Sequence, residues 1–94
     1  MQIDDFMWLS NVVEELATKH GVDVDEVEEV FFNNPRYRFV ESGYRSGQNV
    51  YAAAGQTDAG RYLIVFFIRR ADDSALILTA RDMDRRERRL YGRK

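Results

Sequence analysis

Seven successive apolar residues, Tyr62 to Ile68, constrain the fold more than any other stretch of the chain. A strand with one solvent-exposed face alternates apolar and polar residues, whereas an unbroken apolar run is typical of a strand buried on both faces. The run is far too short to cross a membrane, which takes about 20 apolar residues. We therefore predict a central strand over residues 61–70.

Three further strands are predicted from alternation and from turn residues. Aromatic and arginine side chains alternate over residues 36–42, a second strand over 49–55 follows a turn at 43–47, and a fourth over 75–81 follows a turn at 72–74. A hairpin loop at 57–60 ends in Gly60, where a positive φ is expected. Because short turns join strands that pair antiparallel, the prediction is a four-stranded antiparallel meander.

Two amphipathic helices are predicted before these strands. From about residue 5 to residue 19 apolar side chains recur at helical spacing, and Gly21 is a suitable C-terminal stop. Asp23 and Glu26 have the spacing of a capping box at the start of the second helix. That helix ends before Pro35, because the residue preceding a proline avoids the helical region.

A last helix follows the fourth strand, with Asp82 as its predicted N-cap. Met83, Leu90 and Tyr91 fall on the side that we expect to dock on the sheet, and the opposite side carries the arginines at positions 85, 86, 88 and 89. The predicted order is ααββββα in an α+β fold. Residues 1–94 make one domain, since cores of this size rarely split.

Charge is unevenly distributed along the chain. Residues 1–34 hold nine acidic residues against one lysine, a net charge of −8, whereas residues 35–94 hold seven acidic residues against thirteen basic ones, a net charge of +6. Twelve of the fourteen basic residues are arginines, which suit planar, two-pronged contacts with phosphate or carboxylate. The basic part is the candidate for an anionic ligand, and a solvated surface with internal ion pairs is the alternative.

Composition excludes several classes of protein. The chain has no cysteine, which excludes disulfides and cysteine-ligated metals. Asp4 and Asp5 stand where a signal peptide would be basic and then apolar, so we expect a cytoplasmic protein without a membrane segment. The loop from Gly55 to Gly60 lacks the glycine spacing and the lysine of a phosphate-binding loop, and we expect no cofactor.

Three motifs resemble those of one protein family. Lys19-His20-Gly21-Val22 precedes an acidic helix that ends in Val30-Phe31, Gly55 to Arg61 forms the hairpin region, and Arg81 is followed by the run Arg85 to Tyr91. In this order, over about residues 19–91, they resemble the signatures of BrnT-type toxins. The resemblance implies a RelE-like fold and the toxin half of a type II toxin–antitoxin pair.

The resemblance also implies partners and an activity. Members of the family are ribonucleases that arrest translation and are neutralised by a BrnA antitoxin, whose DNA-binding part represses the operon. We accordingly expect an RNA substrate, no bound metal, a monomer when alone and a hetero-oligomer with a BrnA-like antitoxin.

Metal-free RNA cleavage requires loss of a proton from the 2′-hydroxyl, stabilisation of charge on the phosphorane and a proton for the leaving oxygen. His20 is the sole histidine, so a mechanism with two histidines is impossible. Arg81, fixed between a strand and a helix, is the leading catalytic candidate. The other catalytic candidates are His20, Lys19 and Arg70, and the RNA-binding candidates are Arg61, Arg69, Arg85, Arg86 and Arg89. Glu41 and Asp58 are candidate bases.

Each candidate also has a structural alternative. His20 can cap a helix, and Arg69 and Arg70 can pair with Asp72 or Asp73. The family pattern Phe-Glu-Trp-Asp with a following lysine is replaced by Phe6-Met7-Trp8-Leu9, and Gln48-Asn49-Val50 replaces a Glu and an Arg. A catalytically inactive relative that binds an antitoxin or nucleic acid is therefore the alternative function, and a protein module whose arginines meet an acidic partner is a third.

Overall fold

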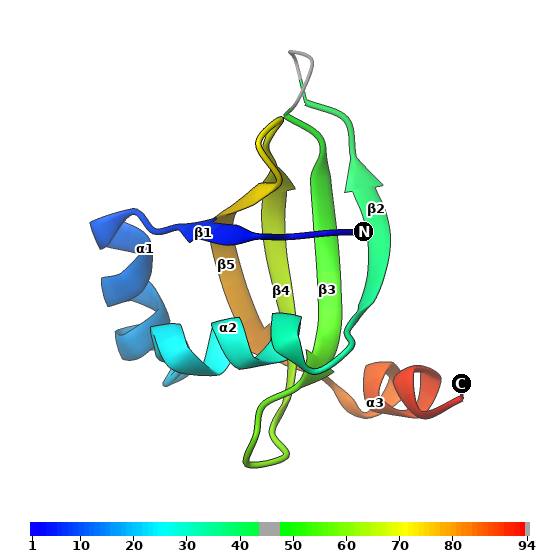
Figure 1. The fold of residues 1–94 in the computed structure, drawn as a ribbon. Helices are drawn as coiled ribbons and strands as arrows, with labels where there is room; N and C mark the ends of the chain where they lie inside the picture. Colours follow the sequence, from blue (N-terminus) through cyan, green and yellow to red (C-terminus); the bar gives the residue numbers. More distant parts are fainter. Residues whose placement is uncertain (44–47, 94) are drawn as a thin grey trace.

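A computed structural model describes residues 1–43 and 48–93 as a five-stranded mixed sheet with helices on both faces (Figure 1). The strands lie in the order β1-β5-β4-β3-β2. The elements are β1 (Asp5–Met7), α1 (Ser10–Glu15), the π-helical turn η1 (Leu16–His20), α2 (Val24–Phe32), β2 (Arg36–Glu41), β3 (Val50–Gln56), β4 (Tyr62–Arg69), β5 (Ser74–Asp82) and α3 (Arg85–Gly92).

The sheet contains a strand that periodicity did not reveal. Residues 5–7, expected to be helical, form β1 and pair parallel with β5, with Phe6 opposite Ala75. The pairing partner lies about 70 residues away in the chain, so no local pattern signals it, and Phe6 is held by an edge-on contact with Phe31 at 5.1 Å between ring centroids. The expectation of a four-stranded, purely antiparallel sheet is therefore wrong.

The other strands follow the predicted pairing closely. β2 to β5 each pair antiparallel with the next strand in sequence, and β4 is the middle strand of the five, as its unbroken apolar run indicated. The α+β class is thus confirmed, while the RelE-like order stays a prediction. The predicted turn at 43–47 falls mostly outside the described residues.

One face of the sheet is covered by the N-terminal part of the chain, with α2 across the near side and α1 at the left in Figure 1. The predicted stop at Gly21 is confirmed, since this residue has φ 60° and the π-helical turn ends there. The capping box of Asp23 and Glu26 is also present. Val27 and Val30 of α2 are fully buried against this face of the sheet, with Leu63 and Phe67 of β4 in the same core.

The opposite face carries a smaller core under α3, formed by Ala52, Ile64, Met83 and Tyr91. The N-cap of α3 is Asp84 and not Asp82, because β5 runs on to Asp82 and the backbone N–H of Met83 still donates to the carbonyl of Tyr62 at 3.0 Å. Met83 and Tyr91 dock as predicted, but Leu90 is 49% exposed. Among the described residues no helix has the length and apolar character to span a membrane.

Candidate functional site: an arginine-lined groove beneath the last helix

Arg81 lies on β5 and projects onto the face of the sheet that α3 partly covers, because it pairs with Ile64 of that face. Its guanidinium donates two hydrogen bonds to the Glu87 carboxylate, Nη1 to Oε1 at 2.7 Å and Nη2 to Oε2 at 2.9 Å. Nη1 also donates to the Asp82 carbonyl at 3.2 Å. Within residues 1–43 and 48–93 the Nε–H of Arg81 makes no hydrogen bond, so one edge of the guanidinium is left for an anion.

Glu87 is the counter-charge of this arginine. The hydrogen bonds from Arg81 are the main cause that lowers the pKa of the Glu87 carboxyl to about 2, and the backbone N–H of Asp84 and the positive charge of Arg38 act in the same direction. The same ion pair raises the pKa of Arg81. Glu87 is therefore ionised at neutral pH, and its two hydrogen bonds hold the guanidinium of Arg81 in one orientation.

A groove of about 560 Å³ separates α3 from the sheet beside this ion pair. Ala52, Ala54 and Ile64 of the sheet face the groove, and Arg36 and Arg38 of β2 line its far side. The sequence predicts a strand for these two arginines but does not mark them as site residues. Their spacing of two residues was the available signal, because it puts both on one face of the strand.

The helix arginines are exposed, as predicted for their side of α3. Of the predicted RNA-binding residues Arg85, Arg86 and Arg89, the structure places Arg86 at the groove. Arg88 instead lies over the ring of Tyr62, with 4.3 Å between the guanidinium carbon and the ring centroid. Glu87 was missed as a site residue, although its position three residues after Asp84 is a capping-box spacing that the sequence displays.

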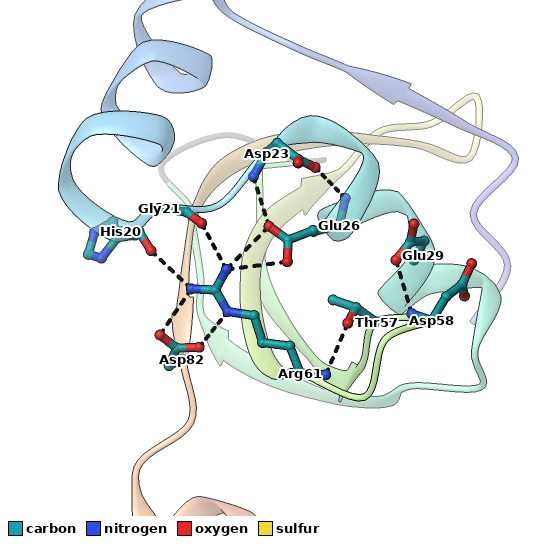
Figure 2. A network of polar contacts seen from close by, with 9 residues as sticks. All are labelled: His20, Gly21, Asp23, Glu26, Glu29, Thr57, Asp58, Arg61 and Asp82. Atoms are coloured by element: carbon teal, nitrogen blue, oxygen red, sulfur yellow. Dashed lines mark hydrogen bonds and ion pairs between the residues drawn. The ribbon is translucent and has the colours of Figure 1, made fainter.

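Arg61 lies on the other side of the sheet and is fully engaged by the protein (Figure 2). It donates to both oxygens of Asp82, with Nε to Oδ1 at 2.7 Å and Nη2 to Oδ2 at 3.1 Å, and Nη1 donates to the Glu26 carboxylate at 3.2 Å. The carbonyl oxygens of Gly21 and His20 accept at 2.8 and 3.0 Å. These contacts raise the pKa of Arg61, mainly through the Asp82 hydrogen bonds, and join the end of η1 to α2 and β5.

His20 belongs to this second cluster, and neither His20 nor Lys19 lies at the groove. His20 offers its backbone carbonyl to Arg61, and its charge helps lower the pKa of Asp82 after the larger effect of the Arg61 hydrogen bond. Lys19 is exposed and lies 3.9 Å from Glu15. Asp82 follows Arg81 directly, but successive strand residues project to opposite faces, so the structure does not bring Lys19 or His20 to Arg81.

Arg69 and Arg70 lie at the opposite end of the sheet, where β4 turns into β5 at the top of Figure 1. Arg69 pairs with Ala75, six residues before Arg81 on β5, which corresponds to about 20 Å along the strand. Arg69 Nη2 donates to Asp73 at 2.6 Å, and Asp72 bonds to Ser74. The four predicted catalytic residues are thus spread over three places.

The two candidate bases are also outside the groove. Asp58 accepts a hydrogen bond from Asn33 at 2.9 Å in the β3–β4 hairpin, and Glu41 ends β2 in an exposed position. In the part of the chain that the structure describes, no three histidine or carboxylate side chains are grouped as metal ligands. Arg36, Arg38 and Arg86 line the groove, and the Arg81–Glu87 ion pair lies at its edge. Fixed positive charge of this kind can stabilise a developing negative charge.

Comparison with curated proteins found no match. Comparison with protein families gave a match over residues 8–87, which is most of the chain and includes Arg81, Glu87 and both arginines of β2. The matching family is described as the ribonuclease toxin BrnT of type II toxin–antitoxin systems. The chain belongs to the BrnT family of ribonuclease toxins.

Proposed function

We propose that this chain cleaves RNA without a metal ion, at the groove between α3 and the sheet, and acts in the cytoplasm as a RelE-like toxin. The observation that carries the proposal is the position of Arg81, which is held by Glu87 at 2.7 and 2.9 Å with Arg38 close enough to lower the pKa of the same carboxylate. Family membership supplies the ribonuclease and toxin roles.

The proposed reaction is transfer within the RNA strand. The 2′-oxygen attacks the adjacent phosphorus, and the bond from phosphorus to the 5′-oxygen breaks. The 2′-proton passes to solvent water, and the 5′-oxygen takes a proton from solvent water. The products are a 2′,3′-cyclic phosphate and a 5′-hydroxyl. Arg81 presents its Nε edge to the phosphate oxygens, and Arg36 and Arg38 add positive charge from β2.

Glu87 acts as a positioning residue in this scheme. A carboxyl with a pKa of about 2 is a weak base at neutral pH, so the catalytic gain rests on electrostatic stabilisation by the arginines. By clamping Nη1 and Nη2, the carboxylate fixes the plane of the Arg81 guanidinium before RNA arrives. Such preorganisation avoids rearrangement during the reaction.

The experiment follows cleavage of a fluorescent single-stranded RNA by protein made in a cell-free system, in excess EDTA. We expect cleavage with cyclic phosphate ends, and a loss on the order of 10²–10³-fold in kcat for Arg81→Ala. Arg88→Ala is the control, since Arg88 packs on Tyr62 outside the groove and its variant should cleave normally. Intact RNA both with and without EDTA would overturn the enzymatic proposal, and cleavage that occurs only without EDTA would overturn its metal-free part.

A BrnA-like antitoxin is the proposed partner, with a monomeric toxin that joins a hetero-oligomer when bound. Family membership implies an antitoxin and leaves its type open. Expression of this chain should arrest growth, and co-expression with the product of the adjoining gene should restore it. Unaffected growth with the chain alone, or arrest that the neighbour does not relieve, contradicts this part.

The second candidate function is an inactive relative that binds RNA or an antitoxin. It is favoured by the neutralisation of Arg81, whose positive charge is already matched by Glu87. An inactive relative should bind the RNA of the cleavage assay and leave it intact, with a log affinity that falls by roughly 0.7 per phosphate contact for each log unit of salt.

A further inference from the structure

The strand register places alanines between arginines on the face of the sheet below α3. One row across the sheet reads Arg36, Ala54, Ile64 and Arg81, since each of these residues pairs with the next. The neighbouring row begins with Arg38 and Ala52. All of them project to the same face, because they are separated by two residues along their strands. Ala52 and Ile64 are buried beneath α3, at 1% and 4% exposed, whereas Ala54 is partly exposed. The open part of the groove is therefore a shallow trough over Ala54, beside Arg36 and Arg38.

The dimensions of the trough match a flat, uncharged group flanked by anions. Strands are about 4.8 Å apart, so the Cα atoms of Arg36 and Arg81 are separated by roughly 14 Å across three strand spacings. The groove of about 560 Å³ is within the size range of small-molecule sites. Phe66 continues the apolar floor next to Ala52, and its ring lies 5.8 Å from the Arg81 guanidinium carbon.

These features of the trough are complementary to one nucleotide of a single-stranded nucleic acid. A nucleobase has two apolar faces and is followed on both sides by phosphates, so it suits an apolar floor between arginines. Guanidinium groups such as those of Arg36 and Arg38 also stack on bases. In a duplex the bases are paired and stacked, and only an unpaired strand can lay a base flat on a protein surface.

We propose that the trough over Ala54 holds one unstacked nucleobase of single-stranded RNA, next to the phosphate bound by Arg81. This inference rests on the proposed RNA substrate and names the part of it that the groove recognises. Ala54 is the central position: it is partly exposed, belongs to the trough floor and has Arg36 and Ile64 as its strand neighbours.

The test uses binding without cleavage. Two oligonucleotides of equal length and charge are compared by fluorescence anisotropy: a 2′-O-methyl RNA, which lacks the attacking hydroxyl, and its counterpart with abasic sugars. We expect the wild-type protein to bind the first about tenfold more tightly, which is within the range for stacking of one base. Equal affinities would overturn the proposal.

Ala54→Leu fills the trough and should abolish this preference while leaving the affinity for the abasic strand unchanged. Ala17→Leu is the matched control, because Ala17 is exposed on η1, on the other face of the sheet, and the variant should keep the preference. If Ala54→Leu does not fold by circular dichroism, Ala54→Val takes its place with a smaller expected loss. A variant that keeps the full tenfold preference contradicts the proposal.

The outcomes separate this inference from the cleavage proposal. A wild-type protein that prefers the base-bearing strand but leaves RNA intact supports the trough and overturns cleavage. A protein that cleaves RNA but binds both strands equally overturns the trough alone. If Ala54→Leu loses only its binding to the antitoxin and keeps the base preference, the groove is an antitoxin surface and the inference fails.

Discussion

Two arginines near the same end of the sheet, Arg61 and Arg81, show how similar residues acquire different roles. Both are paired with carboxylates, and both have a raised pKa. Arg61 is bound by two carboxylates and two backbone carbonyls, and its side chain is 28% exposed. Arg81 is bound by one carboxylate and one carbonyl, and it is 40% exposed beside a groove.

The difference follows from where the partners come from. The partners of Arg61 belong to η1, α2 and β5, so its removal would release contacts between separate layers. The partners of Arg81 belong to the adjoining residue and to the first turns of α3. An arginine whose N–H groups all donate hydrogen bonds within the protein has a structural role. An arginine that has an unused N–H edge beside a groove is available to a ligand.

The largest expected effect is the loss of stability in Arg61→Ala. Removing this side chain leaves the Glu26 and Asp82 carboxylates and two backbone carbonyls without their donor. Because Asp82 is mostly exposed, we expect a decrease of about 2–3 kcal/mol in the free energy of unfolding, below the value for a fully buried pair. Urea unfolding of Arg61→Ala and of the wild-type protein measures this decrease.

Arg70→Ala is the matched control for that experiment. Arg70 is exposed, and its side chain makes no hydrogen bond or ion pair within the described residues, so its loss should change stability by no more than about 0.5 kcal/mol. The loss of unfolding free energy in Arg81→Ala should lie between those of Arg70→Ala and Arg61→Ala, at about 1 kcal/mol or less, because the ion pair of Arg81 is partly exposed. Equal stabilities of Arg61→Ala and wild type would remove the proposed distinction.

A second, smaller effect concerns the salt dependence of RNA binding. If Arg81 contacts a phosphate, Arg81→Ala should reduce the slope of log affinity against log salt by roughly 0.7. Arg38→Ala should do the same, whereas Arg61→Ala, measured under conditions in which the variant is folded, should leave the slope unchanged. A reduced slope in the Arg61 variant would show that the two arginines share one ligand.

The smallest expected effect is the acid sensitivity of the Arg81–Glu87 pair. The pKa of Glu87 is 4.5 in an unstructured chain and about 2 in the fold, so the folded state favours the ionised form. The resulting stabilisation is complete above about pH 4.5 and is lost as the pH falls towards 2. Glu87→Gln, which can still cap α3, should therefore lose less stability than wild type between pH 5 and pH 3.

The same unfolding series includes Arg81→Met as a matched variant. Deleting the arginine removes the main cause of the low Glu87 pKa, so both variants should show a similar, flatter dependence on pH. If Glu87→Gln and wild type lose stability in parallel over this range, the ion pair does not contribute to acid sensitivity.

Much of the fold could be predicted from local patterns. The unbroken run at residues 62–68 identified the central strand, and Asp23 with Glu26 identified the start of α2. Each of these two signals is contained within a few consecutive residues. β1 escaped prediction because its three residues are extended only through pairing with β5. The sequence predicts Asp82 as a helix cap because an aspartate before a helix is a common cap, but the hydrogen bonds between β5 and β4 continue past it.

The candidate site was predictable only in part. Arg81 could be proposed from its place between a strand and a helix, and the exposed arginines of α3 from helical spacing. Arg36 and Arg38 could not be joined to Arg81 without the register of the strands, since four strands must be aligned side by side to form the row. The separation of Lys19, His20 and Arg70 from Arg81 likewise depends on which face and which end of the sheet each residue occupies.

By itself the sequence determined the secondary structure of most of the chain, the class of fold and the family, because propensity, periodicity and motifs act over short separations. Only the tertiary structure decided which arginines hold segments of the protein together and which lie beside a groove. That decision depends on strand order, register and the carboxylates that converge from distant segments, such as Glu26 and Asp82 on Arg61. Charge alone cannot reveal it, because a guanidinium has the same charge whether its donors are consumed or open to a ligand.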